Sequence, residues 1–219
     1  MDFNFIREYV PYFIAAAVLT IRIASIGISI SILFGLLCSI IRYFRIPILH
    51  RLIDIYIELS RNTPLLIQLF FLYFGLPKLG IVLSSETCAI TGLVFLGGSY
   101  MAEAFRSGLE AIGNSQIEAG LSLGLTKSQV IRFIVLPQAI SISIPAFSAN
   151  VIFLIKETSV FSAVALIDLM NVAKDLIGLY YKTDETLFML VSSYLIILLP
   201  LSIAFTLIER RLRHAGYGN

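Results

Sequence analysis

The side chains best placed to bind a ligand lie in the fourth of five apolar stretches. Asn150, Leu154 and Glu157 recur at i, i+4 and i+7, so on a helix they share one face, with Phe153 beside them. Asn150 stands roughly 20 Å along such a helix from Pro137, which places it near the middle of a membrane. A polar face at that depth must contact protein or water rather than lipid. We therefore predict that these four side chains line a pathway for a polar solute.

Two pairs of charged residues also stand at helical spacing. Glu58 and Arg61 are three residues apart, as are Glu103 and Arg106, so each pair can meet on one helix face. Charged side chains within a membrane are costly unless they are paired. We therefore predict an ion-pair network that holds two neighbouring helices together. An inner gate or a direct contact with a substrate is the alternative role for these side chains.

No pattern typical of catalysis or of metal binding accompanies them. Cys38 and Cys88 stand in separate apolar stretches without redox or ligand spacing, and His50 and His214 lie in basic stretches without partners. A membrane-embedded metalloenzyme would need a motif such as H-E-x-x-H, which the sequence lacks. We expect no catalytic residue and no metal ligand in this chain.

The elements that must position these residues are long and apolar. Of 219 residues, 58% are hydrophobic and 14% are charged, and the mean hydropathy is +0.92. A helix of about 20 apolar residues crosses a hydrocarbon core of about 30 Å. We predict one domain over residues 1–219, an all-α polytopic membrane protein with about five transmembrane helices, at residues 12–41, 52–76, 87–105, 138–161 and 186–208.

Prolines and short segments should interrupt this pattern. Pro11 is expected to separate a short interfacial helix at residues 2–10 from the first span, and Pro64 to kink or restart the second. Residues 162–170 are apolar but too short to cross, which predicts a re-entrant or interfacial piece packed in protein. Residues 171–185 read as a polar connection.

The basic residues predict the orientation. Ten lie on one side of the five-span arrangement and four on the other, and the richer side faces the cytoplasm by the positive-inside rule. The N-terminus then faces out and the C-terminus in. The ten are Arg42, Arg45, Arg51, Arg61, Arg106, Lys127, Arg132, Arg210, Arg211 and Arg213; the four are Arg7, Lys78, Lys174 and Lys182.

One cytoplasmic segment, EAGLSLGLTKSQVIRFIVLP at residues 118–137, is amphipathic and cannot span a bilayer. Gly124 stands between two short helical patterns, where a residue free to adopt positive φ allows a tight turn. Thr126 can cap the second helix through its hydroxyl. Such a helix–turn–helix can lie at the membrane surface and present a rigid contact to a soluble partner.

This segment resembles the EAA loop of the membrane subunits of ABC importers, in which Glu-Ala-Ala is followed at fixed spacing by Gly and by Ile-x-Leu-Pro. The matching positions here are Glu118, Ala119, Gly124, Ile134, Leu136 and Pro137. Gly120 replaces the second alanine, and within a helix this exchange costs about 1 kcal/mol. The departure concerns only local helix propensity.

Further segments resemble permeases for polar amino acids. These are ELSRNTPLLIQLFFLYFGLP at residues 58–77, SYMAEAFRSGLEAI at 99–112, LPQAISISIPAF at 136–147 and LIKETSV at 154–160. The resemblance implies a permease subunit of a type I ABC importer, in a bacterial cytoplasmic membrane. It also implies a second permease subunit, either identical or a paralogue, a pair of ATPase subunits and an extracytoplasmic solute-binding protein.

Energy must come from the ATPase partners, because the chain has no phosphate loop of the form G-x-x-x-x-G-K-[ST]. ATP and Mg²⁺ are expected on those subunits and no cofactor on this chain. The resemblance assigns the ATPase-coupling role to Glu118, Ala119, Gly120, Gly124, Leu136 and Pro137. We expect Glu118 to hold the loop through a hydrogen bond or an ion pair, with an exposed surface charge as the alternative.

An amino-acid substrate is a zwitterion, which needs an acceptor for its ammonium and a donor for its carboxylate. Asn150 and Glu157 could accept, and Lys156 or a helix N-terminus could donate; alternatively, Lys156 and Glu157 only close the outer end of the helix. A neutral Asn150 at mid-depth favours neutral or acidic amino acids over arginine-like ones.

A secondary transporter would require an inverted repeat with broken helices, and five unequal spans argue against it. Neither the sequence pattern nor the charge gives a reason to expect nucleic-acid binding.

Overall fold

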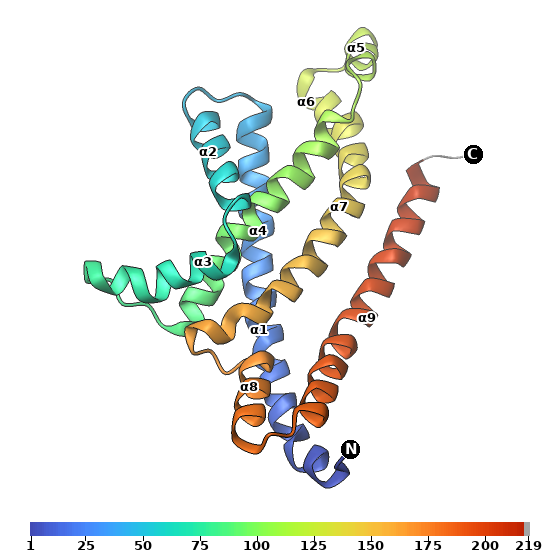
Figure 1. The fold of residues 1–219 in the computed structure, drawn as a ribbon. Helices are drawn as coiled ribbons and strands as arrows, with labels where there is room; N and C mark the ends of the chain where they lie inside the picture. The colour runs from blue at the N-terminus through green and yellow to red at the C-terminus, as the bar shows by residue number, and fades with distance from the viewer. Residues whose placement is uncertain (217–219) are drawn as a thin grey trace.

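The computed structural model describes the backbone of residues 1–216 and the side chains of residues 1–212, so the side chains of Arg213 and His214 lie outside it. Within that part the chain is helical and contains no strand, which confirms the all-α prediction. Figure 1 shows an elongated bundle with the N-terminus at one end and α5 at the other. The helices are α1 (Phe3–Tyr43), α2 (Leu49–Arg61), α3 (Leu65–Phe70), α4 (Ser85–Glu110), α5 (Asn114–Ser122), α6 (Lys127–Val130), α7 (Leu136–Glu157), α8 (Leu169–Tyr180) and α9 (Thr183–Gly216).

Four continuous helices are long and apolar enough to cross a membrane: Phe3–Tyr43, Ser85–Glu110, Lys127–Val164 and Thr183–Leu212. The second predicted span is divided in two. Helix α2 ends at Arg61, and a new apolar helical segment runs over Leu65–Leu79, with α3 at its start. Pro64 adopts an extended backbone at this restart. The fifth crossing, and with it the orientation, stays a prediction.

Helix α1 is continuous through Pro11, so the separate helix predicted at residues 2–10 is wrong. Its cap stands at Asp2, whose carboxylate accepts from the backbone N–H of Asn4 and Phe5. Apolar packing continues on both sides of the proline, because Phe5 and Phe13 are buried in one cluster with α8. This packing compensates for the one backbone hydrogen bond that proline cannot make.

The chain between α7 and α9 is more ordered than a polar connection. A 3-10 helix over Thr158–Val164 follows α7, and the apolar side chains of Phe161, Val164 and Leu166 are buried, as expected of a segment packed in protein. Helix α8 then occupies most of the predicted polar connection. It begins after Asp168, whose carboxylate accepts from the backbone N–H of Asn171 at 2.9 Å.

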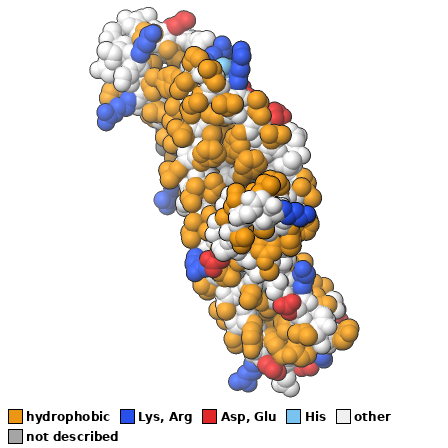
Figure 2. Space-filling model, turned by 90° about the vertical axis from the view of Figure 1, so that its left-hand side faces the viewer, with side chains coloured by type: hydrophobic (Ala, Val, Ile, Leu, Met, Phe, Trp, Pro, Cys, Tyr) orange, Lys and Arg blue, Asp and Glu red, His pale blue; other side chains and the backbone are white. Residues whose placement is uncertain are grey.

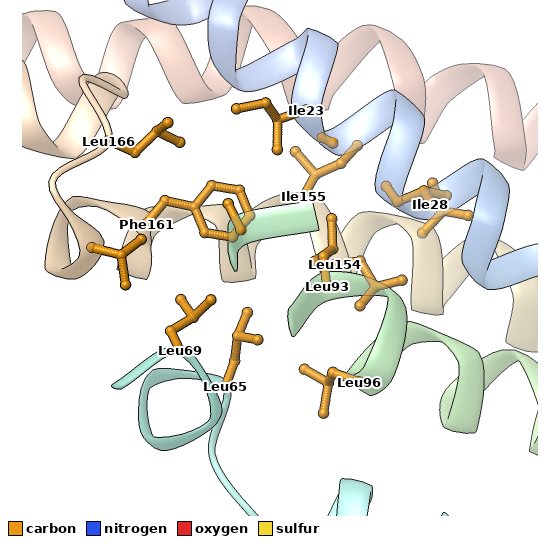
Figure 3. Packing of buried hydrophobic residues seen from close by; sticks show 14 of the residues in the cluster. Ile23, Ile28, Leu65, Leu69, Leu93, Leu96, Leu154, Ile155, Phe161 and Leu166 are labelled. Carbon is orange, nitrogen blue, oxygen red and sulfur yellow. The ribbon is translucent and has the colours of Figure 1, made fainter. Parts of the chain in front are cut away.

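The main core lies where α1, α4 and α7 meet the start of α3 (Figure 3). Ile23 of α1, Leu93 of α4 and Leu154 of α7 are fully buried there. A hydroxyl also joins two helices, since Ser31 of α1 donates to the carbonyl of Leu93 at 3.3 Å. This core fixes the positions of the elements around the site.

The outer faces of the long helices carry many exposed apolar side chains, and α9 is the least buried of the four long helices. Figure 2 shows hydrophobic side chains over most of one face, with Lys, Arg, Asp and Glu at both ends and a few along its length. Exposed apolar surface of this extent is the pattern that a lipid bilayer requires.

Candidate functional site

The break between α2 and α3 exposes backbone groups that the surrounding side chains satisfy. Gln68 donates through Nε2 to the carbonyls of Ser60 and Thr63, each at 3.1 Å. Ser60 in turn donates through Oγ to the carbonyl of Phe95 on α4 at 2.8 Å. Irregular backbone is tolerated at membrane depth where protein contacts satisfy it or where it lines a cavity. Here the side chains hold the break in one conformation against α4.

A cavity of about 320 Å³, called the pocket below, opens beside this break. Its volume lies within the range of roughly 300–1,000 Å³ that is typical of small-molecule sites. Three elements form its walls: the α2–α3 break, α4, and the end of α7 with the 3-10 helix that follows. The lining residues are Arg61, Asn62, Thr63, Pro64, Leu65, Leu66, Leu96, Tyr100, Phe153, Glu157 and Val160.

Two opposite charges line different walls of the pocket. The guanidinium carbon of Arg61 lies 5.2 Å from the centre of the Tyr100 ring, a cation–π arrangement, and the Phe153 ring lies 5.0 Å from that of Tyr100. On the α7 wall, the half-buried Glu157 forms no ion pair or hydrogen bond with any other described side chain or backbone group. A guanidinium and a free carboxylate can bind the carboxylate and the ammonium of one small zwitterion.

The predicted substrate face of α7 is divided between the pocket and the core. Phe153 and Glu157 line the pocket, but Leu154 is fully buried in the core and packs toward Gly97 of α4. Asn150 donates to the backbone carbonyl of Tyr100 at 3.0 Å and does not line the pocket. Close packing of α7 on α4 turns this side of the helix inward, so the pocket faces the side that carries Phe153 and Glu157.

The donor for a carboxylate also differs from the prediction. Lys156 is exposed and lies outside the pocket lining, whereas Arg61, assigned from the sequence to an ion pair, stands in its wall. Asn62, Thr63 and Tyr100 line the pocket and were not among the residues predicted for a site, whereas substrate contact was the alternative role predicted for Arg61. One signal was available, because a helix that Pro64 interrupts within an apolar stretch is where discontinuous helices expose polar groups.

The predicted ion pairs are rearranged around one carboxylate. Arg106 contacts Glu103 at 2.7 Å, and Arg42 of α1 also bonds to Glu103, so the contact joins α1 to α4. Arg61 lies 3.9 Å from Glu103 rather than against Glu58. Glu58 accepts instead from the side chain of Asn62 at 3.0 Å. The Glu58–Arg61 pair is therefore not formed, because the helix ends at Arg61 and its guanidinium turns toward α4.

The α5–α6 unit (residues 114–137) projects from the end of the bundle (Figure 1). Gly124 adopts φ +82°, and the N–H groups of Gly124 and Leu125 donate to the carbonyls of Leu121 and Gly120. This is a Schellman motif, in which a residue with positive φ ends the helix. Thr126 and Gln129 then form a reciprocal capping box at the start of α6. The predicted turn and cap are both present.

The other residues of this unit lie at different depths. Gly120 is buried against Val130 and Ile134, whereas Glu118 and Ala119 are exposed. The side chain of Glu118 forms no hydrogen bond or ion pair with the described residues, so it does not hold the unit together within this chain. Helix α6 passes through a π-helical turn into α7 at the exposed residues Leu136 and Pro137. Pro137 has no backbone N–H to donate to the preceding turn, and the wider π turn accommodates this missing hydrogen bond.

Comparison with known proteins gives a consistent picture. The family model described as "Binding-protein-dependent transport system inner membrane component" matches residues 27–214. A probable glutamine ABC transporter permease protein, GlnP, of Bacillus subtilis is 37% identical over 180 residues, which are 81% of this chain and 83% of that protein. The glutamine transport system permease protein GlnP of Escherichia coli is 30% identical over 97% of this chain and 98% of its own.

Solved structures agree with the sequence relatives. An amino acid ABC transporter crystallised with histidines superposes with a TM-score of 0.90 and is 30% identical, covering 96% of this chain and 99% of its own. The MetNI methionine ABC transporter, in an inward-facing conformation, superposes with a TM-score of 0.76 at 20% identity, over 91% of this chain and 95% of its own. At that identity the second likeness concerns the fold alone.

Proposed function

Because the chain belongs to the family of inner membrane components of binding-protein-dependent transport systems, we propose that its pocket binds the amino acid that the transporter carries. The chain is an amino acid permease subunit of an ABC importer and an integral membrane protein, and ATP is hydrolysed by a separate subunit. We propose where in this chain the substrate binds, which amino acid it is, and which subunits assemble with the chain.

The pairing of Arg61 with Glu157 across the pocket carries this proposal. The guanidinium can donate to the α-carboxylate, and the carboxylate of Glu157 can accept from the α-ammonium. Each group lines the cavity and comes from a different helix. Because both fixed charges are used by the zwitterion, the rest of the pocket, with Asn62 and Thr63 on its wall, favours a neutral polar side chain. The relatives described as glutamine permeases support this choice.

We further propose the assembly that this function requires. Residues 1–219 act as one transmembrane domain of a bacterial cytoplasmic membrane, with the N-terminus out and the C-terminus in. The domain pairs with a second permease, a copy or a paralogue, and an extracytoplasmic binding protein delivers the substrate. Two ATPase subunits, which carry ATP and Mg²⁺, contact the α5–α6 unit, where the exposed Glu118 is free to bind them. This chain itself holds no cofactor.

The proposal is tested by glutamine uptake into vesicles that contain the permease, its ATPase and its binding protein. Glu157→Gln removes the charge that would bind the ammonium, and a hydrogen bond to a charged group contributes about 1.5–3 kcal/mol. Uptake efficiency should fall at least about tenfold. Assembly with the ATPase should be unchanged, since Glu157 ends α7 about 30 Å along the helix from Pro137.

Lys156→Gln is the matched control, because it neutralises the adjacent residue, which is exposed and outside the pocket lining. It should transport as the wild type does. Equal uptake by wild type and Glu157→Gln would refute the pocket as the substrate site. Loss of the assembled complex in Glu157→Gln would instead assign that residue a structural role.

A further inference from the structure

Three arginines near the pocket differ in how many carboxylates they contact. Arg42 has two partners, with Nε 2.7 Å from Asp54 and a second bond to Glu103. Arg106 also has two, Glu103 at 2.7 Å and Glu110 at 2.5 Å. Both guanidinium groups are thus held on two sides, and neither lines the pocket.

Arg61 is held more loosely than the other two. Within the described side chains its one carboxylate partner is Glu103, with 3.9 Å between Nη1 and Oε2, and this contact is too long to be a hydrogen bond. Its side chain is 43% exposed. The N–H donors of Arg61 therefore remain available to a ligand, while the charge of Glu103 still attracts the guanidinium from outside the pocket.

Helix geometry places the two groups that hold Arg61 on one face of α4. Tyr100 and Glu103 are three residues apart, so the ring and the carboxylate are neighbours on the helix surface. Tyr100 lines the pocket and Glu103 does not. Arg61 consequently lies at the boundary between the pocket and the ion-pair network, and a substrate carboxylate on the pocket side would compete with Glu103 for the same guanidinium.

We propose that Glu103 is a positioning residue that tunes substrate affinity by competing with the substrate carboxylate for Arg61. This inference rests on the proposed function of the pocket. In the empty pocket Glu103 keeps the guanidinium above the Tyr100 ring. When an amino acid binds, Arg61 exchanges this long contact for direct hydrogen bonds, and the competition limits how tightly the substrate is held. A transporter must release what it binds, so a weaker hold favours turnover.

The test measures binding of glutamine to the permease–ATPase complex in lipid nanodiscs, without the binding protein. Glu103→Gln keeps one acceptor oxygen, which can serve Arg42 or Arg106, and removes the competing charge. An exposed ion pair of this kind changes an equilibrium by about two- to fivefold, so the Kd of glutamine should fall by that factor. Glutamine dissociation should slow correspondingly. The α-amide of glutamine, which lacks the carboxylate, should show no such gain.

Two further variants make the outcome specific. Glu110→Gln is the matched control, because Glu110 contacts Arg106 and not Arg61, and its Kd should equal that of the wild type. In Arg61→Gln, glutamine should bind at least about tenfold more weakly. Adding Glu103→Gln to that variant should not change the Kd of glutamine further, because Glu103 is proposed to act through Arg61.

The possible failures are distinguishable. If Glu103→Gln behaves as Glu110→Gln does, binds more weakly than the wild type, or still tightens binding in the Arg61→Gln background, the competing role of Glu103 is wrong. If Arg61→Gln itself binds glutamine as the wild type does, the pocket is not the substrate site, and the proposed function fails with it.

Discussion

The α5–α6 unit and the pocket are built from interactions of different range. In the unit, the turn and cap join near neighbours, such as Leu125 to Gly120 and Gln129 to Thr126. In the pocket region, the decisive contacts join residues far apart in the chain, such as Asn150 to Tyr100, which are separated by 50 positions. Local contacts therefore fix the turn and cap of the unit, whereas the pocket depends on how three helices are placed.

The two regions also differ in how they use charge. Glu118, the acidic residue of the α5–α6 unit, points into solvent and is free for a partner. Around the pocket, Glu103 is shared by three arginines while Glu157 has no partner among the described residues. An unpaired carboxylate is costly to keep in a membrane protein, so its retention beside a cavity is an argument for function.

Asp168 also has an unpaired carboxylate oxygen but belongs to neither region. It therefore tests whether such a group implies function by itself. It is fully buried, and its Oδ2 has no hydrogen-bond partner in the described structure. Burial raises the pKa of Asp168 to about 6, against the opposing effects of the backbone N–H groups at the start of α8 and of the nearby Lys174. Because this pKa lies above the ordinary value, the associated stability is complete below about pH 4 and is lost as the pH rises through 6.

Asp168→Asn keeps a side chain that can cap α8 but cannot ionise, so the loss of stability with rising pH should disappear. At pH 7.5 the variant should be more stable than the wild type by up to about 3 kcal/mol. The difference between the two proteins should shrink when both are unfolded thermally in detergent at pH 5. Transport should be retained, in contrast to Glu157→Gln. Destabilisation at pH 7.5, or a gap independent of pH, would show that the carboxylate is satisfied by a contact that these residues do not provide.

Gly124→Val tests the local geometry of the α5–α6 unit. A non-glycine residue with positive φ costs about 1–2 kcal/mol, so the equilibrium constant for forming the turn should fall roughly five- to thirtyfold. Space is not the cause, because nothing lies within 4 Å of an added Cβ. Uptake and stimulation of the ATPase should fall while substrate binding to the pocket persists. Gly124→Asn, which tolerates this conformation, is the control and should keep most activity; equal effects of the two would contradict a conformational cause.

Asn150→Ala tests the long-range side of the contrast. Its side chain joins α7 to α4, and the Tyr100 carbonyl that it contacts can still accept its own helical hydrogen bond after the change. The variant should lose about 1 kcal/mol of stability, measured by thermal unfolding. Glutamine affinity should change little compared with Glu157→Gln. A tenfold loss of affinity without destabilisation would restore Asn150 to the substrate site.

The sequence predicted those features that local rules decide. The turn at Gly124, the cap at Thr126 and four of the five predicted spans follow from residue type and spacing. The helix boundary predicted at Pro11 is wrong because tertiary packing on both sides of the proline outweighs its local effect on the helix. Helix α8 was missed for the same reason, since its formation depends on burial of Leu169 and its neighbours against α1 and α9.

The pocket could be predicted only in part, because helical spacing defines faces but not the direction in which each face points. Asn150 and Leu154 share the predicted face, yet close packing with α4 buries it and leaves Glu157 at the cavity. Arg61 was paired with Glu58 from its spacing alone. Its contact with Tyr100 joins two helices, and no local pattern in one sequence contains that information.

Gly120→Ala, the change with the smallest expected effect, asks whether the α5–α6 unit is as self-contained as its local contacts indicate. An added Cβ would lie 2.7 Å from Cδ1 of Ile134 and 3.0 Å from Cγ2 of Val130, both of which are side-chain ends. The Ile134 methyl can rotate away, and alanine gains up to about 1 kcal/mol of helix propensity over glycine. These effects oppose each other, so stability should stay within about 0.5 kcal/mol of the wild type and coupling should be unchanged. Gly120→Leu cannot be accommodated in this way and should cost about 1–3 kcal/mol. A measurable loss of ATPase-driven uptake in Gly120→Ala would mean that the spacing between α5 and the α6 helix with its π turn is set to within a methyl group, and that the unit depends on packing as finely as the pocket does.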